Sequence, residues 1–168
     1  MDDVKIVLSV LLALAALGKD LKSGKIPNRL ILAGTAAAVI LCLLSGCSLP
    51  DTAAGAALPL LFPGILFFFR MTGAGDVKLL CVLGAILGFA ASRSLILRSF
   101  VLGGFQALLV LISRGNAAER FHVLSAYLRN CIRSRKLLPY TDRSPSGRMH
   151  FSVSILGAVL WHALEKRL

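Results

Sequence analysis

VKLLCVLGAILGFAA at residues 77–91 and LILRSFVLGGFQALLVLIS at residues 95–113 are two apolar runs separated by only three residues. Their lengths approach or reach the roughly 20 residues that a helix needs to cross the hydrocarbon core of a bilayer. Further apolar runs occupy residues 4–18, 30–46, 53–69 and 151–164. We therefore predict an all-α membrane protein of six transmembrane helices, with residues 1–168 forming one domain.

The overall composition agrees with this prediction. The chain is 57% hydrophobic and only 16% charged, whereas soluble domains contain about 45–50% apolar and 25% charged residues. Such a composition excludes a disordered chain and argues against a soluble globular protein. Because Asp2 and Asp3 make the extreme N-terminus acidic, we expect the first run to remain as a span rather than be cleaved as a secretory signal.

The distribution of basic residues predicts the orientation. The chain has 19 Lys and Arg against 8 Asp and Glu, a net charge of +11, which in a soluble protein would suggest nucleic-acid binding. Here 14 of the 19 lie in the loops 19–29, 70–78 and 114–150. The positive-inside rule then places these loops in the cytoplasm and both termini outside. We expect the cations to contact anionic lipid and predict no nucleic-acid partner.

Loop 114–150 has a pattern of its own. Its apolar residues recur at nearly helical spacing after Asn116, a residue suited to capping a helix. They are Phe121, Leu124, Tyr127, Leu128, Cys131 and Ile132. Arg and Lys residues lie between and after them, so we predict a basic amphipathic helix on the inner leaflet.

Two of the few acidic residues occupy matching positions. Asp20 follows the first run and Asp76 precedes the fourth, so both lie at the predicted cytoplasmic face. Two neighbouring carboxyls tend to share one proton, and one can then activate water while the other polarises a carbonyl. This is aspartic peptidase chemistry and needs no metal. Helix dipoles favour Asp76 as the base and Asp20 as the proton holder.

Each of these aspartates has a simpler interpretation, because an isolated carboxylate can mark a membrane boundary or pair with a nearby lysine. The neighbouring residues favour a functional role. Gly73 and Gly75 allow the backbone near Asp76 to approach a substrate strand closely. After Asp20, Pro27 directs the chain into the second run, and Asn28 is suited to capping that helix.

Together the two segments resemble the type IV prepilin peptidases, which are membrane aspartic peptidases with a GxGD motif. The resemblance rests on Asp20-x5-Ile26-Pro27-Asn28 after the first run and on Gly73-x-Gly75-Asp76-Val77-Lys78 before the fourth. It implies that Asp20 and Asp76 form the catalytic pair, that Gly73 and Gly75 shape the loop holding Asp76, and that Lys78 orients a carboxylate or a substrate group.

The same resemblance implies a substrate and a location. Members remove the short basic leader of prepilins or pseudopilins at the cytoplasmic face of the bacterial inner membrane. The long members carry paired CxxC motifs and also N-methylate their product, but the four cysteines here show no CxxC spacing. The chain resembles the short form of Tad/Flp pilus systems, so we expect peptidase activity without N-methylation.

Alternative functions remain open from the sequence. His122, His150 and His162 are dispersed and lack acidic or cysteine ligands at metal spacing, so we predict no metal site and no cofactor. A small transporter with intramembrane carboxylates and a non-catalytic module of secretion assembly are the rival interpretations. The sequence does not determine the oligomeric state.

Overall fold

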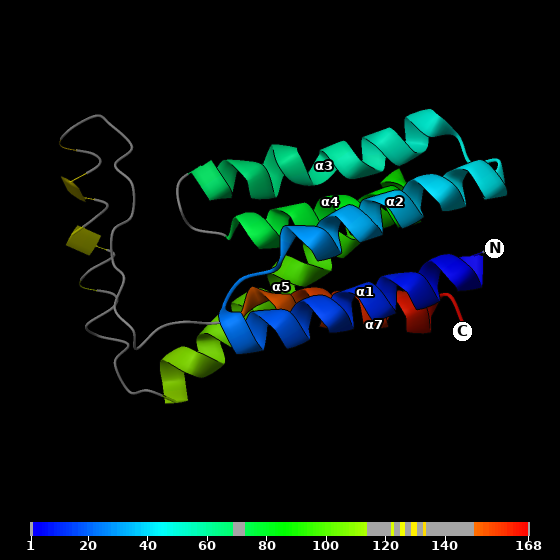
Figure 1. The fold of residues 1–168 in the computed structure, drawn as a ribbon. Helices are drawn as coiled ribbons and strands as arrows, with labels where there is room; N and C mark the ends of the chain where they lie inside the picture. The colour runs from blue at the N-terminus through cyan, green and yellow to red at the C-terminus, as the bar shows by residue number, and fades with distance from the viewer. Residues whose placement is uncertain are drawn as a thin grey trace.

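The computed structural model is a bundle of roughly aligned helices in which consecutive helices run antiparallel (Figure 1). It describes residues 2–68, 73–113 and 150–167, together with His122, Ser125, Ala126, Arg129, Asn130 and Arg133; the side chains of residues 66–68 are not described. The six helices with described bounds are α1 (Asp2–Ser23), α2 (Asn28–Ser45), α3 (Leu49–Phe68), α4 (Ala74–Leu87), α5 (Phe89–Ser113) and α7 (Phe151–Glu165).

Each predicted apolar run contains or overlaps one of these helices, but one boundary was predicted wrongly. We expected the fourth run to continue to residue 91 and the fifth to begin at residue 95. Instead α4 ends at Leu87, because Gly88 adopts a φ of +86°, which favours glycine. The carboxylate of Asp51 then accepts a hydrogen bond from the Phe89 N–H at 3.3 Å, and α5 begins at Phe89, with only Gly88 between it and α4.

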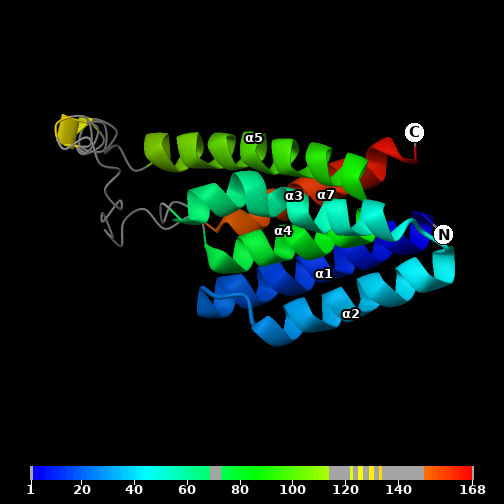
Figure 2. The ribbon, with the colours of Figure 1, turned by 90° about the horizontal axis from the view of Figure 1, so that it is seen from above.

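Helix α4 is the centre of the bundle, because it contacts all five other helices named above. Its residues Leu79, Leu80 and Leu83 are completely buried. Seen from above, α2 and α5 lie on opposite sides of the bundle (Figure 2). The N- and C-termini lie together at one end, so the α1–α2 connection and the starts of α4 and α7 lie at the other (Figure 1).

Small residues let α3 and α4 approach each other closely. A Cβ added to Gly55 would collide with the carbonyl oxygen of Gly84, and one added to Gly84 would collide with the carbonyl oxygen of Gly55. The hydroxyl of Ser92 on α5 also donates to the Gly55 carbonyl at 2.9 Å. Glycine contacts of this kind are typical of helix pairs in membranes.

The outer faces of the helices are apolar. Leu43 and Leu44 on α2, Leu61 on α3 and Val101 on α5 are each about two-thirds or more exposed. Helices α2 and α5 are long and apolar enough to cross a membrane. An outward apolar surface around an apolar core is the arrangement of a membrane protein.

The predicted amphipathic helix lies largely outside the described residues. Six positions within it are described, and all are helical. They are His122, Ser125, Ala126, Arg129, Asn130 and Arg133.

Candidate active site

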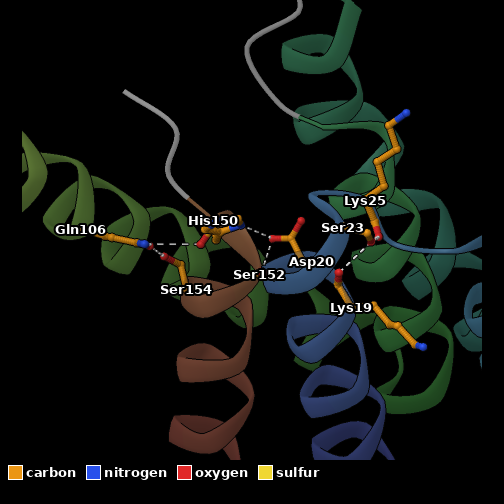
Figure 3. Close-up of polar contacts among 8 residues, drawn as sticks. All are labelled: Lys19, Asp20, Ser23, Lys25, Gln106, His150, Ser152 and Ser154. Carbon is orange, nitrogen blue, oxygen red and sulfur yellow. Dashed lines mark hydrogen bonds and ion pairs between the residues drawn. The ribbon is translucent and has the colours of Figure 1, made fainter. Parts of the chain in front are cut away.

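Asp20 lies in the last turn of α1, at the end of the bundle away from the termini. Helix α1 ends at Ser23, and the next residue, Gly24, has a φ of +62°. The Gly24 N–H donates a hydrogen bond to the Asp20 carbonyl at 2.7 Å. The hydroxyl of Ser23 donates to the carbonyls of Lys19 and Lys25 and holds this turn (Figure 3). These bonds fix the position of the Asp20 side chain relative to the α1–α2 connection.

Asp76 lies in the first turn of α4, one residue before the predicted span 77–91. Gly73 is the N-cap of this helix in an extended conformation, and its carbonyl accepts the Asp76 N–H at 3.1 Å. The Asp76 carboxyl folds back over Gly73, so that a Cβ on Gly73 would lie 2.9 Å from Oδ2 of Asp76. Only glycine leaves this space to the carboxyl.

The two aspartates line one cavity of about 360 Å³. Gly73 and Gly75 line it from the start of α4, and Lys25 and Lys78 also contribute to its wall. The predicted site residues are therefore assembled by the fold, although residues 20 and 76 are far apart in sequence. The cavity is large enough for a short stretch of extended peptide.

The two sequence motifs are in direct contact. A Cβ on Gly75 would lie 3.1 Å from Cβ of Ile26, and Nζ of Lys78 donates to Oδ1 of Asn28 at 3.0 Å. The Ile-Pro-Asn segment thus packs on the glycine loop. Lys78 lines the cavity, but its ammonium is bound to Asn28.

The carboxylate of Asp20 binds two side chains from the start of α7. Its Oδ2 accepts a hydrogen bond from Oγ of Ser152 at 2.6 Å and lies 3.0 Å from Nδ1 of His150 (Figure 3). The side chain of Asp20 is only 13% exposed.

Gln106 on α5 extends this network. Its Nε2 donates to the His150 carbonyl at 3.4 Å, and its Oε1 accepts a hydrogen bond from Oγ of Ser154 at 2.8 Å. Sequence reasoning missed His150, Ser152 and Gln106. Gln106 could have been noticed, because it is the only amide side chain in the apolar run 95–113 and a polar group in a membrane needs a partner.

The surroundings of the two carboxyls differ in a way that affects their protonation. Burial raises the pKa of Asp76 to about 6, with the negative charge of Asp20 as the second cause, and the Gly73 N–H and His150 act in the opposite direction. Asp20 instead faces two polar side chains at the N-terminus of α7. These environments favour Asp76 as the proton holder, the reverse of the assignment suggested by the dipoles of α1 and α4.

Residues 6–108 match the model of the type IV leader peptidase family. This stretch includes Asp20 and Asp76 and covers more than half of the chain. The chain therefore belongs to the type IV leader peptidase family, and it is a type IV leader peptidase-like protease. No curated protein and no solved structure matches it.

Proposed function

We propose that this chain is an aspartic endopeptidase that removes the short basic leader of prepilins or pseudopilins, with Asp20 and Asp76 as the catalytic pair. The observation that carries the proposal is the cavity that both carboxyls line beside the glycine loop. Two carboxyls at one cavity, one of them with a raised pKa, are what acid–base hydrolysis of a peptide requires.

The reaction follows from the two protonation states. The ionised carboxylate takes a proton from water, and the water oxygen bonds to the scissile carbonyl carbon while the protonated carboxyl donates to the carbonyl oxygen. The carboxyl that received the water proton then delivers it to the departing nitrogen as the C–N bond breaks, while the other carboxylate takes back a proton from a hydroxyl of the tetrahedral intermediate, which re-forms the carbonyl and restores the starting protonation states. The products are a free leader carboxylate and a new pilin N-terminus, without any covalent enzyme intermediate.

We further propose six spans with the active site at the cytoplasmic face of a bacterial inner membrane. Helices α1 to α5 and α7 supply the spans, and α2 and α5 alone are long and apolar enough by themselves. The basic residues support this orientation, because 14 of the 19 Lys and Arg lie in residues 19–29, 70–78 and 114–150. The first two of these segments contain the cavity residues Asp20, Lys25, Asp76 and Lys78.

The proposed substrate is a prepilin of the Tad/Flp type. The resemblance to the prepilin peptidases implies that the leader is short and basic and ends at a glycine before an apolar helix. We propose that the apolar helix enters from the bilayer beside the spans, because Lys25 and Lys78 at the cavity would repel a basic leader. N-methylation is not part of the proposed activity.

Co-expression with a Flp-type prepilin tests this function. We expect the wild type to shorten the prepilin on a gel, with N-terminal sequencing giving one new start after the leader glycine. Asp20→Asn and Asp76→Asn should abolish processing at matched membrane levels. Asp3→Asn, which changes an exposed carboxyl at the opposite end of α1, is the matched control and should process normally.

Three outcomes would contradict parts of the proposal. Processing by both Asp→Asn variants would exclude the pair as catalytic. No processing by any form, across several prepilins, would favour a transporter or an assembly module instead. A product N-methylated in cells that contain this protein and no other prepilin methyltransferase would contradict the proposed absence of methylation.

A further inference from the structure

The first turn of α7 supplies the polar contacts of Asp20 described above. Both contacts fall on one oxygen, Oδ2, so that Oδ1 has no hydrogen-bond partner among the described residues. His150 and Ser152 lie beyond residue 108, where the family match ends. The match therefore gives no role to either residue.

We propose that His150 and Ser152 are positioning residues that hold Asp20 as the ionised base of the pair, leaving Asp76 to carry the proton. This inference rests on the proposed peptidase function. Donors directed at a carboxylate stabilise its anion and fix its rotamer, and the N-terminus of a helix adds a partial positive charge. Ser152 is 1% exposed, so water does not compete for its hydroxyl.

Gln106 supports the arrangement from α5. By donating to the His150 carbonyl and accepting from Ser154, it ties the helix cap to a neighbouring helix. Figure 3 shows this chain of contacts running from Gln106 through the start of α7 to Asp20. The position of Asp20 is thus set by three helices, α1, α5 and α7.

Within residues 2–68, 73–113 and 150–167, few charged groups lie near Asp20. His150 faces it from α7, Asp76 acts on the same cavity from α4, and Lys25 and Lys78 line that cavity. Figure 3 shows the ammonium groups of Lys19 and Lys25 pointing away from the Asp20 carboxylate. Ser152 and His150 are therefore the groups whose removal should change the charge of Asp20.

Infrared titration of the protein in detergent tests the assignment without any substrate. At about pH 5, we expect the carbonyl band of a protonated carboxyl to disappear in Asp76→Asn and to persist in Asp20→Asn. Ser152→Ala should add a second protonated band at this pH, and Ser152→Thr, which keeps the hydroxyl, should not. A band lost in Asp20→Asn and kept in Asp76→Asn would overturn the proposal, as would the same spectrum for Ser152→Ala and wild type.

Kinetics on a prepilin-type peptide give the second readout, from pH 4.5 to pH 8.5. Loss of a hydrogen bond to a charged group corresponds to about a tenfold change in an equilibrium constant. Ser152→Ala should therefore lower kcat/KM about tenfold at the acidic limb and move that limb to higher pH. Ser152→Thr keeps the hydroxyl and should retain most of the wild-type kcat/KM. Because the carboxyls titrate as a pair, the decisive question is which limb moves.

His150 provides an independent pair of variants. His150→Asn keeps a donor near the position of Nδ1 and should retain most activity, whereas His150→Ala should lose it. If the Ser152→Ala protein does not accumulate in the membrane, the two His150 variants still test the proposal. The His150 side chain is 34% exposed, so its replacement should not prevent folding. Equal activity of the two His150 variants would overturn the role of His150.

Ser99→Ala is the matched control for the serine change. Ser99 on α5 is fully buried, and its hydroxyl has no hydrogen-bond partner within the described part of the chain. The Ser99→Ala variant should keep the wild-type pH profile and the wild-type infrared bands. A shift as large as that of Ser152→Ala would overturn the proposal. If no form processes the peptide, the proposed function fails, while the infrared bands still decide the roles of Asp20 and Asp76.

Discussion

Gly75 lies directly against Ile26, and this contact joins the two motifs that define the site. A Cβ on Gly75 would lie 3.1 Å from Cβ and 3.3 Å from Cγ1 of Ile26. The glycine thus allows the α1–α2 connection to pack on the first turn of α4. Since these two segments carry Asp20 and Asp76, the closeness of their packing sets the separation of the two carboxyls.

The contact predicts a specific pattern of compensation. Gly75→Ala should lower processing about tenfold, because Ile26 must move by a few tenths of an ångström and the α1–α2 connection moves with it. Ile26→Ala removes Cγ1 and Cδ1, two of the three Ile26 atoms that the added Cβ would meet, and by itself should lower activity less than Gly75→Ala does. The double variant should recover much of the lost activity, as measured by a double-mutant cycle on processing rate. Additive losses would show that the contact does not set the geometry.

Gly73→Ala should separate activity from stability. Among the residues that the structure describes, the added Cβ would meet only the Asp76 carboxyl, at 2.9 Å, and the backbone at Gly73 is extended, so alanine fits without backbone strain. We expect Tm within about 2 °C of wild type and a loss of processing of tenfold or more, because the carboxyl must leave its position. Gly104→Ala, in open space on α5, is the control and should change neither. Normal processing by Gly73→Ala would contradict the observed position of the Asp76 carboxyl.

Asp76 should make stability fall as pH rises. Because its pKa is raised from 3.8 to about 6, the folded protein binds a proton that the unfolded chain has lost in this range. Its contribution is complete below pH 3.8 and is lost as pH rises through about 6. The difference corresponds to about 2–3 kcal/mol, so Tm in detergent should fall over this window.

Asp76→Asn should remove that contribution to the pH dependence. Above pH 6 the variant should melt at a higher temperature than wild type, since no buried charge has to form. The comparison is differential scanning fluorimetry of the two proteins from pH 4 to pH 8, with Asp3→Asn as control. Parallel curves for wild type and Asp76→Asn would contradict a raised pKa.

Cys47 provides a test of the topology at the other end of the bundle. Nζ of Lys5 donates to Sγ of Cys47 at 2.8 Å, and this hydrogen bond is the main cause that lowers the pKa of the thiol. A variant with Cys47 as its sole cysteine should react with a membrane-impermeant maleimide added to intact spheroplasts. Lys5→Gln should slow the reaction at pH 7, because less thiolate is present.

The side from which Cys47 is labelled decides the orientation. Labelling from outside is expected, since Cys47 belongs to the α2–α3 connection, which lies at the end of the bundle that holds both termini (Figure 1). Labelling only after the spheroplasts are lysed would place that end in the cytoplasm and contradict the proposed position of the active site. The rate with Lys5→Gln, measured on lysed membranes, tests the thiol separately from the orientation.

The sequence by itself determined the class of fold and the pair of aspartates. Six apolar runs with basic loops are visible without any structure, because lipid requires long apolar helices and charge asymmetry orients them. Asp20 and Asp76 were identifiable because acidic residues are scarce and each stands at the end of a run, beside a recognisable motif. The end of α4 at Leu87 was not predicted, because one glycine with positive φ interrupts an otherwise continuous apolar stretch.

Only the tertiary structure decided what surrounds each carboxyl. His150 and Ser152 are 130 and 132 residues from Asp20 in sequence, and no local pattern relates them. Their contact depends on how α7 packs against α1, just as the raised pKa of Asp76 depends on the burial of its carboxyl near Asp20. Periodicity and charge act along the chain, whereas protonation depends on neighbours in space. The sequence therefore identified the pair, and the packing distinguished the environments of its two members.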